Sequence, residues 1–446
     1  MNTLEHNSIF YPSIKENANR AKLVNLIFLV YWLLIFEGAL RKWILPELHQ
    51  VLYFVKDPLV LIIYWKALKF RFYPNDLVFK FAMLIAFLMT FVVLIQVNTQ
   101  TTPILVLLFG FRNYFFLIPL AFIIKSAFEK IDLDRLIRQT LMLSIPMAML
   151  VVVQFYSSPD SFVNKGVTDE GYVMVVVENI VRTTGTFTYT AGQSIFCGSV
   201  FAILAFVWTL SSSHRPIKKS YLLVASVAVI TLIALSGSRT VFFFVFLVLL
   251  AMLVSNFLIR DITRKAKSFF VPLALIFFGA LIFIYIFPEA LDAIVGRQQT
   301  AVDDEGSTIA RAFRSFYQFA YITIDVPSFG YGIGSQSAGG LSLSQGTFDS
   351  IEDDEWTRLV IENGFIVAGL YILLRLSLAI KLFIGSIKAL NVSGNSLSFI
   401  LLSFLVMPLI NGSITTQGTI NGYVWLFAGF TMAASKVYSR SLKTVY

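Results

Sequence analysis

The stretch LVFKFAMLIAFLMTFVVLIQV, residues 77–97, contains one charged side chain, Lys80. About 20 predominantly apolar residues are what an α-helix needs to cross the hydrocarbon core of a bilayer. The rest of the 446-residue chain has the same character, because 57% of its residues are hydrophobic, 14% are charged and its mean hydropathy is +0.76. This composition excludes a water-soluble domain and predicts an all-α protein that crosses a membrane many times.

Eleven further runs have the length of a membrane span, so we predict about twelve spans in all. They are 23–40, 50–67, 103–124, 138–157, 192–210, 221–236, 241–259, 268–287, 365–385, 397–414 and 415–435. The pairs 221–236 with 241–259 and 397–414 with 415–435 are so closely spaced that each is alternatively one bent element. Residues 1–22 lack the short apolar core and cleavage site of a signal peptide, so the first span is expected to target the chain to the membrane.

Basic residues are unevenly distributed between the two sides of the predicted membrane. Of the 35 lysines and arginines, 22 lie on the side of the N-terminus, 9 lie on the opposite side, and the other four lie within or at the edge of spans. Because cytoplasmic loops of membrane proteins are enriched in lysine and arginine, we predict that both termini are cytoplasmic. The same enrichment explains the net charge of +9 without a nucleic-acid partner.

This orientation gives the chain three parts. Residues 1–287 form nine spans with a periplasmic loop at 158–191, residues 288–364 form one large, partly helical periplasmic loop, and residues 365–446 form three spans and a cytoplasmic tail. The cytoplasmic connections are too short for a nucleotide-binding βαβ unit of ~30 residues. No Gly-x-x-x-x-Gly-Lys-Ser/Thr motif occurs, so the sequence offers no place for ATP or a nucleotide sugar to bind.

Metal and disulfide chemistry also find little support in the sequence. The three histidines, His6, His49 and His214, lie in separate segments, and the one cysteine, Cys197, lies within a predicted span. The only Asp-x-Asp motif, residues 132–134, stands at the predicted start of a helix, where acidic side chains complement the helix dipole. We therefore predict no cofactor and no metal.

Charged side chains within the predicted spans are candidate functional residues, because burying a charge in a bilayer is costly. Those in or near the outer half of the membrane are Glu37, Lys56, Asp57, Arg112 and Arg375. With Arg239 on its short external turn, they are predicted to line one pocket that opens outward. The alternative for the first three is structural pairing, with Arg41 and with one another. No helical neighbour is expected to neutralise Arg112, Arg239 or Arg375.

The loop 288–364 carries the densest polar pattern. Residues 308–325 are predicted to form an amphipathic helix, with Arg311 and Gln318 on a polar stripe and phenylalanines on another sector. The stretch PSFGYGIG, residues 327–334, then ends the helix with glycines that permit tight turns and close backbone approach. The four consecutive acids at 352–355 either cap the helix that follows or supply a general base.

Several motifs make the chain resemble the Wzy-type polysaccharide polymerases and WaaL-type O-antigen ligases, membrane glycosyltransferases of the GT-C class. The motifs are RTTGTF at 182–187, SGSRT at 236–240, the segment from Arg311 through DVPSFGYG at 325–332, LVIENG at 359–364 and, as in a subgroup associated with exopolysaccharides, EGALRKW at 37–43. Ligases of this superfamily carry a histidine shortly before the glycine equivalent to Gly364, where this chain has its acidic run. The resemblance therefore favours a polymerase over a ligase.

The resemblance implies a metal-independent, inverting glycosyltransferase in the bacterial cytoplasmic (inner) membrane. It would transfer a growing glycan from undecaprenyl diphosphate onto a lipid-linked repeat unit at the periplasmic face. The implied diphosphate-binding residues are Arg239, Arg311, Arg314 and Arg112, the implied substrate-binding residues are Arg182, Arg375 and Gln318, and the implied base is Glu355, Asp354 or Asp353.

The expected partners are the undecaprenyl-diphosphate-linked oligosaccharide, the lipid bilayer, a chain-length regulator and a flippase. An O-antigen ligase remains an alternative. A secondary transporter or a flippase is an alternative from another class, in which Glu37, Asp57 and Arg112 would form a relay. The chain shows no internal repeat with paired broken helices, which many transporters have.

Overall fold

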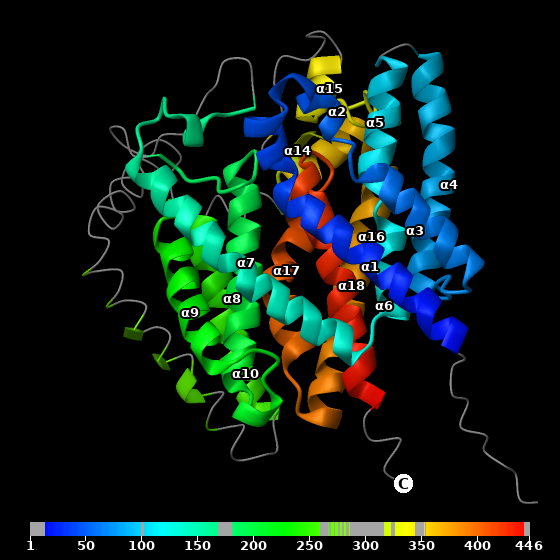
Figure 1. Cartoon of the computed structure of the whole chain (residues 1–446). Helices are drawn as coiled ribbons and strands as arrows, with labels where there is room; N and C mark the ends of the chain where they lie inside the picture. Colours follow the sequence, from blue (N-terminus) through cyan, green and yellow to red (C-terminus); the bar gives the residue numbers. More distant parts are fainter. Residues whose placement is uncertain are drawn as a thin grey trace, which may run out of the picture.

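The computed structural model describes residues 14–99, 102–167, 181–258, 316–322, 326–343, 352 and 354–440, together with scattered positions between 266 and 285. Within these ranges the regular elements are helices, arranged as one bundle (Figure 1). Seven of the described helices are long and apolar enough to cross a membrane. The prediction of an all-α membrane protein is therefore confirmed.

The bounds of the described α-helices follow the chain order of Figure 1. They are α1 Ile14–Ala39, α2 His49–Leu52, α3 Asp57–Lys69, α4 Leu77–Asn98, α5 Ile104–Phe115, α6 Ile118–Ala127, α7 Lys130–Tyr156, α8 Thr190–Thr209, α9 Lys219–Ala234, α10 Arg239–Leu258, α14 Phe319–Ile322, α15 Ala338–Leu343, α16 Glu355–Ser393, α17 Leu397–Asn411 and α18 Gly418–Arg440.

Each predicted span except 268–287 coincides at least in part with one of these helices. Of 268–287 only scattered positions are described, so the count of twelve stays a prediction. The two ambiguous pairs are each resolved as two elements, because α9 ends five residues before Arg239 and α17 ends at Asn411, ahead of α18. The large loop 288–364 is described only over 316–322, 326–343, 352 and 354 onward.

Local side-chain chemistry fixes several helix ends. The Asp76 side chain accepts a hydrogen bond from the Val78 N–H at the start of α4. At α7, Glu129 and Asp132 form a capping box, so the acid pair of the Asp-x-Asp motif begins a helix as predicted. Helix α16 ends at Gly394, which has a positive φ of 63°.

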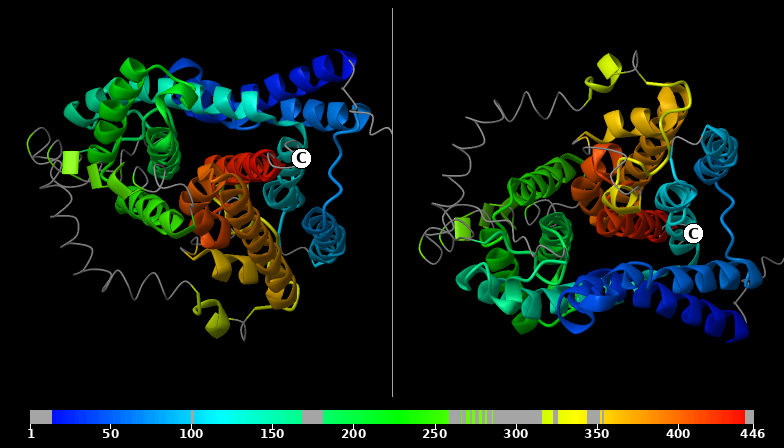
Figure 2. Two further views of the ribbon diagram at one scale, coloured as in Figure 1. Left: turned by 90° about the horizontal axis from the view of Figure 1, so that it is seen from below. Right: turned by 90° about the horizontal axis from the view of Figure 1, so that it is seen from above.

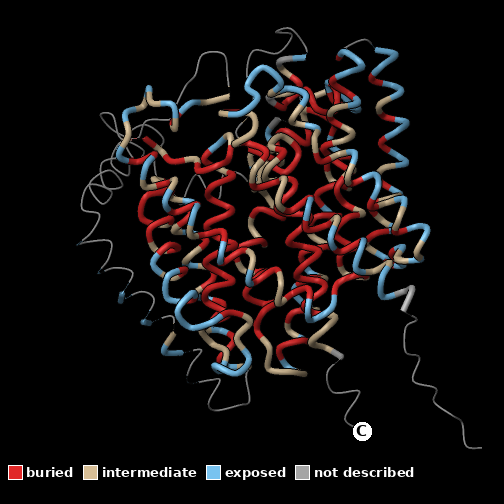
Figure 3. Tube along the Cα trace, viewed as in Figure 1, coloured by how far each residue is buried: buried red, intermediate tan, exposed pale blue. Residues whose placement is uncertain are grey.

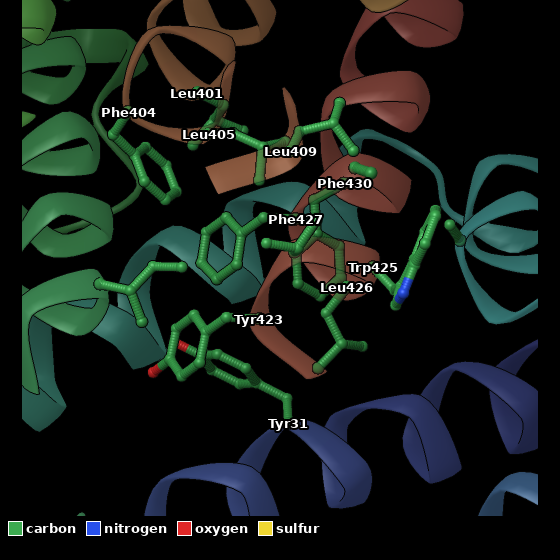
Figure 4. Close-up of a cluster of buried hydrophobic side chains, with 14 of the residues drawn as sticks. Tyr31, Leu401, Phe404, Leu405, Leu409, Tyr423, Trp425, Leu426, Phe427 and Phe430 are labelled. Atoms are coloured by element: carbon green, nitrogen blue, oxygen red, sulfur yellow. The ribbon is translucent and has the colours of Figure 1, made fainter. Parts of the chain in front are cut away.

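The centre of the bundle is the C-terminal helix α18. Its residues 421–435 are all buried, and Figure 4 shows Tyr423, Phe427 and Phe430 packed between α1 and α17. The rings of Tyr423 and Phe427 stack 5.6 Å apart. Within the apolar, membrane-length part of each helix, 89% of the α8 residues are buried but only 28% of the α4 residues. Helix α8 is therefore an inner helix, and α4 is a peripheral one that bilayer lipid would cover (Figure 3).

Viewed along its axis, the bundle has α16–α18 in the middle, between α8–α10 on one side and α4–α6 on the other (Figure 2). We call the end that carries α2, α14 and α15 the loop end, and the opposite end the basic end (Figure 1). At the basic end, Lys125 and Lys381 contact the Asp76 carboxylate at 2.8 and 2.7 Å and tie α4, α6 and α16 together. Burial alone would raise the pKa of Asp76, but hydrogen bonds and charge from the two lysines outweigh it and lower that pKa.

Candidate functional site

Two of the motifs lie side by side at the loop end. The Thr183 hydroxyl donates to the carbonyl oxygen of Leu235 at 2.9 Å, and Ser194 of α8 donates to Ser238 at 3.0 Å. The first bond joins RTTGTF to the residue directly before SGSRT, and the second joins α8 to SGSRT, so the segments that carry Arg182 and Arg239 are neighbours. Both arginines are partly exposed, and Arg239 is the first residue of α10. The structure thus places two predicted ligands of an anionic substrate in one region.

A buried lysine links EGALRKW to RTTGTF. Lys42 is 2% exposed, and its ammonium donates to the Thr184 hydroxyl at 3.1 Å and to the carbonyl oxygens of Gly185 and Phe187 at 2.8 Å each. A side chain at Gly38 would meet the Thr186 carbonyl at 2.3 Å, which shows how closely the segments pack. Lys42 was not among the predicted site residues, although its position at the end of an apolar run marks it as a candidate.

The glycine-rich stretch 327–334 docks onto a break in α16. The N–H groups of Tyr331 and Gly332 donate to the carbonyl oxygens of Ile361 and Glu362 at 2.8 and 3.2 Å. Gly364 has φ 73° and ψ 166° inside α16, and a Cβ there would lie 2.0 Å from the Ser328 carbonyl oxygen. The predicted tight turns and close backbone approach are confirmed, and they occur where the helix changes direction.

Three side chains hold this docked stretch in place. Gln96 of α4 donates to the carbonyl oxygens of Phe329 at 2.6 Å and Glu362 at 2.9 Å, and accepts from the Ile333 N–H at 3.1 Å. The buried Glu362 carboxylate accepts from Tyr114 at 2.6 Å and, through its other oxygen, from the Gln336 N–H at 2.9 Å. Sequence reasoning had not singled out Gln96 or Tyr114, because uncharged polar residues inside apolar runs give little signal.

Glu355 and Arg375 form a buried ion pair at 2.9 Å. The other Glu355 oxygen contacts Arg358 at 3.1 Å, and the Thr415 hydroxyl donates to Glu355 at 3.2 Å. The remaining Arg375 donors reach the carbonyl oxygens of Pro408, Leu409 and Gly412. Arg375 has no acidic neighbour one helical turn away, as the sequence indicated, but Glu355 neutralises it from across the break in α16. In a straight helix the two residues would be ~30 Å apart, so the reversal at Gly364 creates the pair.

Asp354 caps α16, as one of the two sequence interpretations predicted. One carboxylate oxygen accepts from the N–H and hydroxyl of Thr357 at 2.9 and 2.6 Å. The other oxygen, Oδ1, is buried and has no hydrogen-bond partner in the described part of the chain. Burial raises the pKa of Asp354, and the Thr357 hydrogen bonds offset this only in part. Asp353 lies outside the described residues.

Arg112 is also neutralised, by a residue of another helix rather than by a helical neighbour. Its guanidinium forks onto the Asp57 carboxylate at 2.9 and 2.6 Å, because α5 places it beside the start of α3. Glu37 contacts Lys56 at 2.6 Å and Arg41 at 3.3 Å. The structural pairing of Glu37 with Arg41 is confirmed, and the partner of Lys56 is Glu37 rather than Asp57.

The remaining predicted site residues belong to the large loop. Arg311 and Arg314 lie outside the described residues. Gln318 is partly buried in the turn before α14, where Phe316 and Phe319 pack on the Trp356 ring with centroids 5.2 and 5.6 Å apart. That packing brings Gln318 to the first turn of α16, near Asp354 and Glu355.

The predicted residues that the structure describes thus lie in three groups. Arg182 lies with Arg239, Arg112 lies with the charges of α1 and α3, and Gln318 lies by the acids that begin α16. Among the described residues, no group of three or more histidine, cysteine, aspartate or glutamate side chains is arranged to hold a metal ion. Comparison of the chain with protein-family models, curated proteins and solved structures gave no match.

Proposed function

We propose that this protein is a polysaccharide polymerase that transfers a glycan from a polyprenyl diphosphate, undecaprenyl diphosphate in bacteria, onto a lipid-linked repeat unit. The observation that carries the proposal is the junction of RTTGTF with SGSRT through the Thr183–Leu235 hydrogen bond, which brings the segments of Arg182 and Arg239 together. Guanidinium forks match the oxygens of phosphate groups and stay charged when partly buried. Under this proposal the loop end faces the periplasm.

The reaction requires a displaced diphosphate and a deprotonated acceptor. The acceptor hydroxyl oxygen forms a bond to the anomeric carbon from the face opposite the diphosphate, and the bond from that carbon to the diphosphate oxygen breaks. The diphosphate leaves with the electron pair, and the hydroxyl proton passes to a carboxylate. Arg239 and Arg182 would neutralise the leaving group, aided by the N-terminal end of α10, whose N–H groups carry partial positive charge.

Asp354 suits the role of the base better than Glu355. Two arginines and Thr415 occupy the Glu355 carboxylate, whose negative charge pairs with Arg358 and, across the break in α16, with Arg375. Asp354 has one oxygen without a hydrogen-bond partner among the described residues, and burial raises its pKa. A raised pKa brings a carboxylate closer to the value at which a general base works well at neutral pH.

The proposal is tested by reconstitution of the full chain in liposomes with a lipid-linked repeat unit, with gel analysis of product length. Arg239→Lys keeps the charge but loses the fork, so turnover should fall ~10²-fold. Arg215→Lys is the matched control, because that arginine lies at the basic end over the Trp208 ring. Turnover of the wild type should survive EDTA.

Wild-type chain length in the Arg239→Lys variant would remove Arg239 from the site. Movement of intact lipid-linked units across the liposome membrane without polymer would instead identify a flippase. Asp354→Asn should abolish turnover with the protein still folded, and unchanged turnover would exclude Asp354 as the base.

A further inference from the structure

Three cations surround one aromatic ring at the loop end. Arg41, Lys56 and Arg112 lie 5.4, 5.1 and 5.1 Å from the centre of the Tyr53 ring. We call these four residues, with their carboxylate partners Glu37 and Asp57, the tyrosine cluster. Its residues come from the end of α1 and the turn that follows it, from the segment before α3 and the first residue of α3, and from the last turn of α5, and the fold brings them together.

The tyrosine cluster contains more positive than negative charge. Three cations face two carboxylates, which leaves a net charge of +1. The Asp57 carboxylate is taken by Arg112 and one Glu37 oxygen by Lys56, so Arg41 has only a longer contact of 3.3 Å with Glu37. The Arg41 side chain is partly buried, and its Nε has no hydrogen-bond partner among the described residues. Excess positive charge at a partly buried site is costly, and a bound anion would reduce that cost.

An exposed apolar surface adjoins this excess charge. The segment that connects α1 to α3 exposes five large apolar side chains, with 63% of Ile44, 43% of Leu45, 47% of Leu48, 68% of Val51 and 43% of Phe54 accessible. This segment contains α2 and lies at the loop end (Figure 1). A cationic cluster beside an apolar surface at one end of a membrane bundle fits an amphiphile with an acidic head group and a hydrocarbon tail.

On its inner side the tyrosine cluster approaches the acids that begin α16. The Tyr53 ring packs on Phe109 with centroids 5.7 Å apart, and a side chain at Gly418 would meet the Tyr53 hydroxyl oxygen at 2.6 Å. Gly418 follows Thr415 by three residues, and Thr415 contacts Glu355. The connection between α17 and α18 therefore has the tyrosine cluster on one side and the Glu355 ion pairs on the other.

We propose that the tyrosine cluster binds the phosphate head group of a membrane lipid, and that this lipid is the acceptor substrate of the polymerase. Transfer between two lipid diphosphates brings two anionic head groups to the same face of the membrane. The segments of Arg182 and Arg239 serve the donor, and the tyrosine cluster serves the acceptor. Only the identity of the lipid as acceptor rests on the proposed function.

The binding test uses the full chain in detergent and native mass spectrometry to count bound undecaprenyl diphosphate. The key variant is Arg41→Gln, which leaves the Glu37–Lys56 pair intact and so keeps the buried carboxylate neutralised. Arg135→Gln is the matched control: it removes an arginine at the basic end that donates to Asn25 and lies 4.3 Å from the Phe28 ring centre. Arg41→Lys replaces Arg41→Gln if the latter is not recovered as folded protein, since it keeps the charge and loses the fork.

Wild type and Arg135→Gln should each bind two molecules, and Arg41→Gln should bind one, with the affinity of the second site reduced ~10-fold or more. One bound molecule in the wild type, or two at wild-type affinity in the Arg41 variants, would overturn the site. Phosphatidylglycerol is the competing probe. Its displacement of the Arg41-dependent molecule at equal concentration would overturn the assignment to a lipid diphosphate.

Turnover measurements separate this inference from the proposed function. Arg41→Gln should raise the KM for the acceptor lipid with little change in kcat, whereas Arg239→Lys should lower kcat. Two bound lipids in a wild-type preparation that makes no polymer would refute the proposed function and leave the site standing. Polymerisation by Arg41→Gln with an unchanged acceptor KM would refute the acceptor site alone.

Discussion

Replacing Arg375 with methionine removes the centre of a buried ionic network while keeping an unbranched side chain. Arg375 has 0% exposure and makes four contacts, one to Glu355 and three to the carbonyl oxygens of Pro408, Leu409 and Gly412. The substitution removes the Arg375 donor from the Leu409 carbonyl, whereas the Pro408 and Gly412 carbonyls still accept hydrogen bonds from the N–H groups of Gly412 and Ile414. It also leaves Glu355 with Arg358 and Thr415 as its remaining partners.

The expected loss in the free energy of unfolding is ~3–5 kcal/mol. Removing one partner of a buried ion pair costs about that much, because the other charge stays buried. The Leu409 carbonyl oxygen, left without the Arg375 donor, adds ~1–3 kcal/mol, while Arg358 offsets part of the charge on Glu355. Since these terms partly cancel, the range for a single broken pair is the value we expect.

The assay is reversible unfolding of the purified chain in mixed micelles of increasing dodecyl sulfate fraction, followed by circular dichroism. Arg215→Met is the control, because that arginine makes one ring contact and one backbone hydrogen bond and should cost within ~1 kcal/mol. A loss of less than ~1 kcal/mol in Arg375→Met would refute the structural role of the pair. The pair also predicts that Glu355→Gln lowers stability and turnover together, whereas a pure base would lower turnover alone.

Two further predictions concern the basic end and the orientation. The pKa of Asp76 is lowered in the folded state, so its contribution to stability is present above the ordinary aspartate pKa of ~3.9 and is lost as pH falls through the lower folded value. The difference in unfolding free energy between wild type and Asp76→Asn should therefore be constant near neutral pH and shrink below about pH 4. A difference that grows on acidification would contradict this. Because Ser158 and Ser212 are exposed at opposite ends and Cys197 is buried, an impermeant maleimide should label Ser158→Cys in whole spheroplasts and Ser212→Cys only after lysis, and the reverse pattern would invert the topology.

The helices were predictable because a bilayer imposes a simple rule on the sequence. Runs of ~20 apolar residues such as 77–97 fold as helices whatever the positions of the surrounding helices, because in a bilayer the backbone N–H and C=O groups must be paired within the segment. The glycine-rich turns at 327–334 were also predictable, because positive φ leaves few residues other than glycine. Both inferences depend only on local sequence.

Unlike the Glu37–Arg41 pair one helical turn apart, the long-range ion pairs were not predictable, because they depend on which helix ends meet. Glu355 and Arg375 belong to one helix, and their contact exists only because Gly364 reverses the chain against Ser328. Arg112 and Asp57 are 55 residues apart, and the sequence around each residue does not indicate its partner. Spacing along a helix identifies neighbours at three and four residues, so it missed both pairs.

The same contacts separate structural charges from candidates for binding or catalysis. The guanidinium groups of Arg375 and Arg112 donate to the carboxylates of Glu355 and Asp57. A ligand could bind either arginine only by breaking that ion pair. Arg41 and Asp354 differ, since each keeps one buried polar atom without a hydrogen-bond partner in the described chain. A buried donor or acceptor without a partner costs ~1–3 kcal/mol, and such a cost is retained where a ligand supplies the missing bond. Unused hydrogen-bonding capacity, together with position at the loop end, is therefore the basis on which we propose Arg41 for the acceptor head group and Asp354 for its proton.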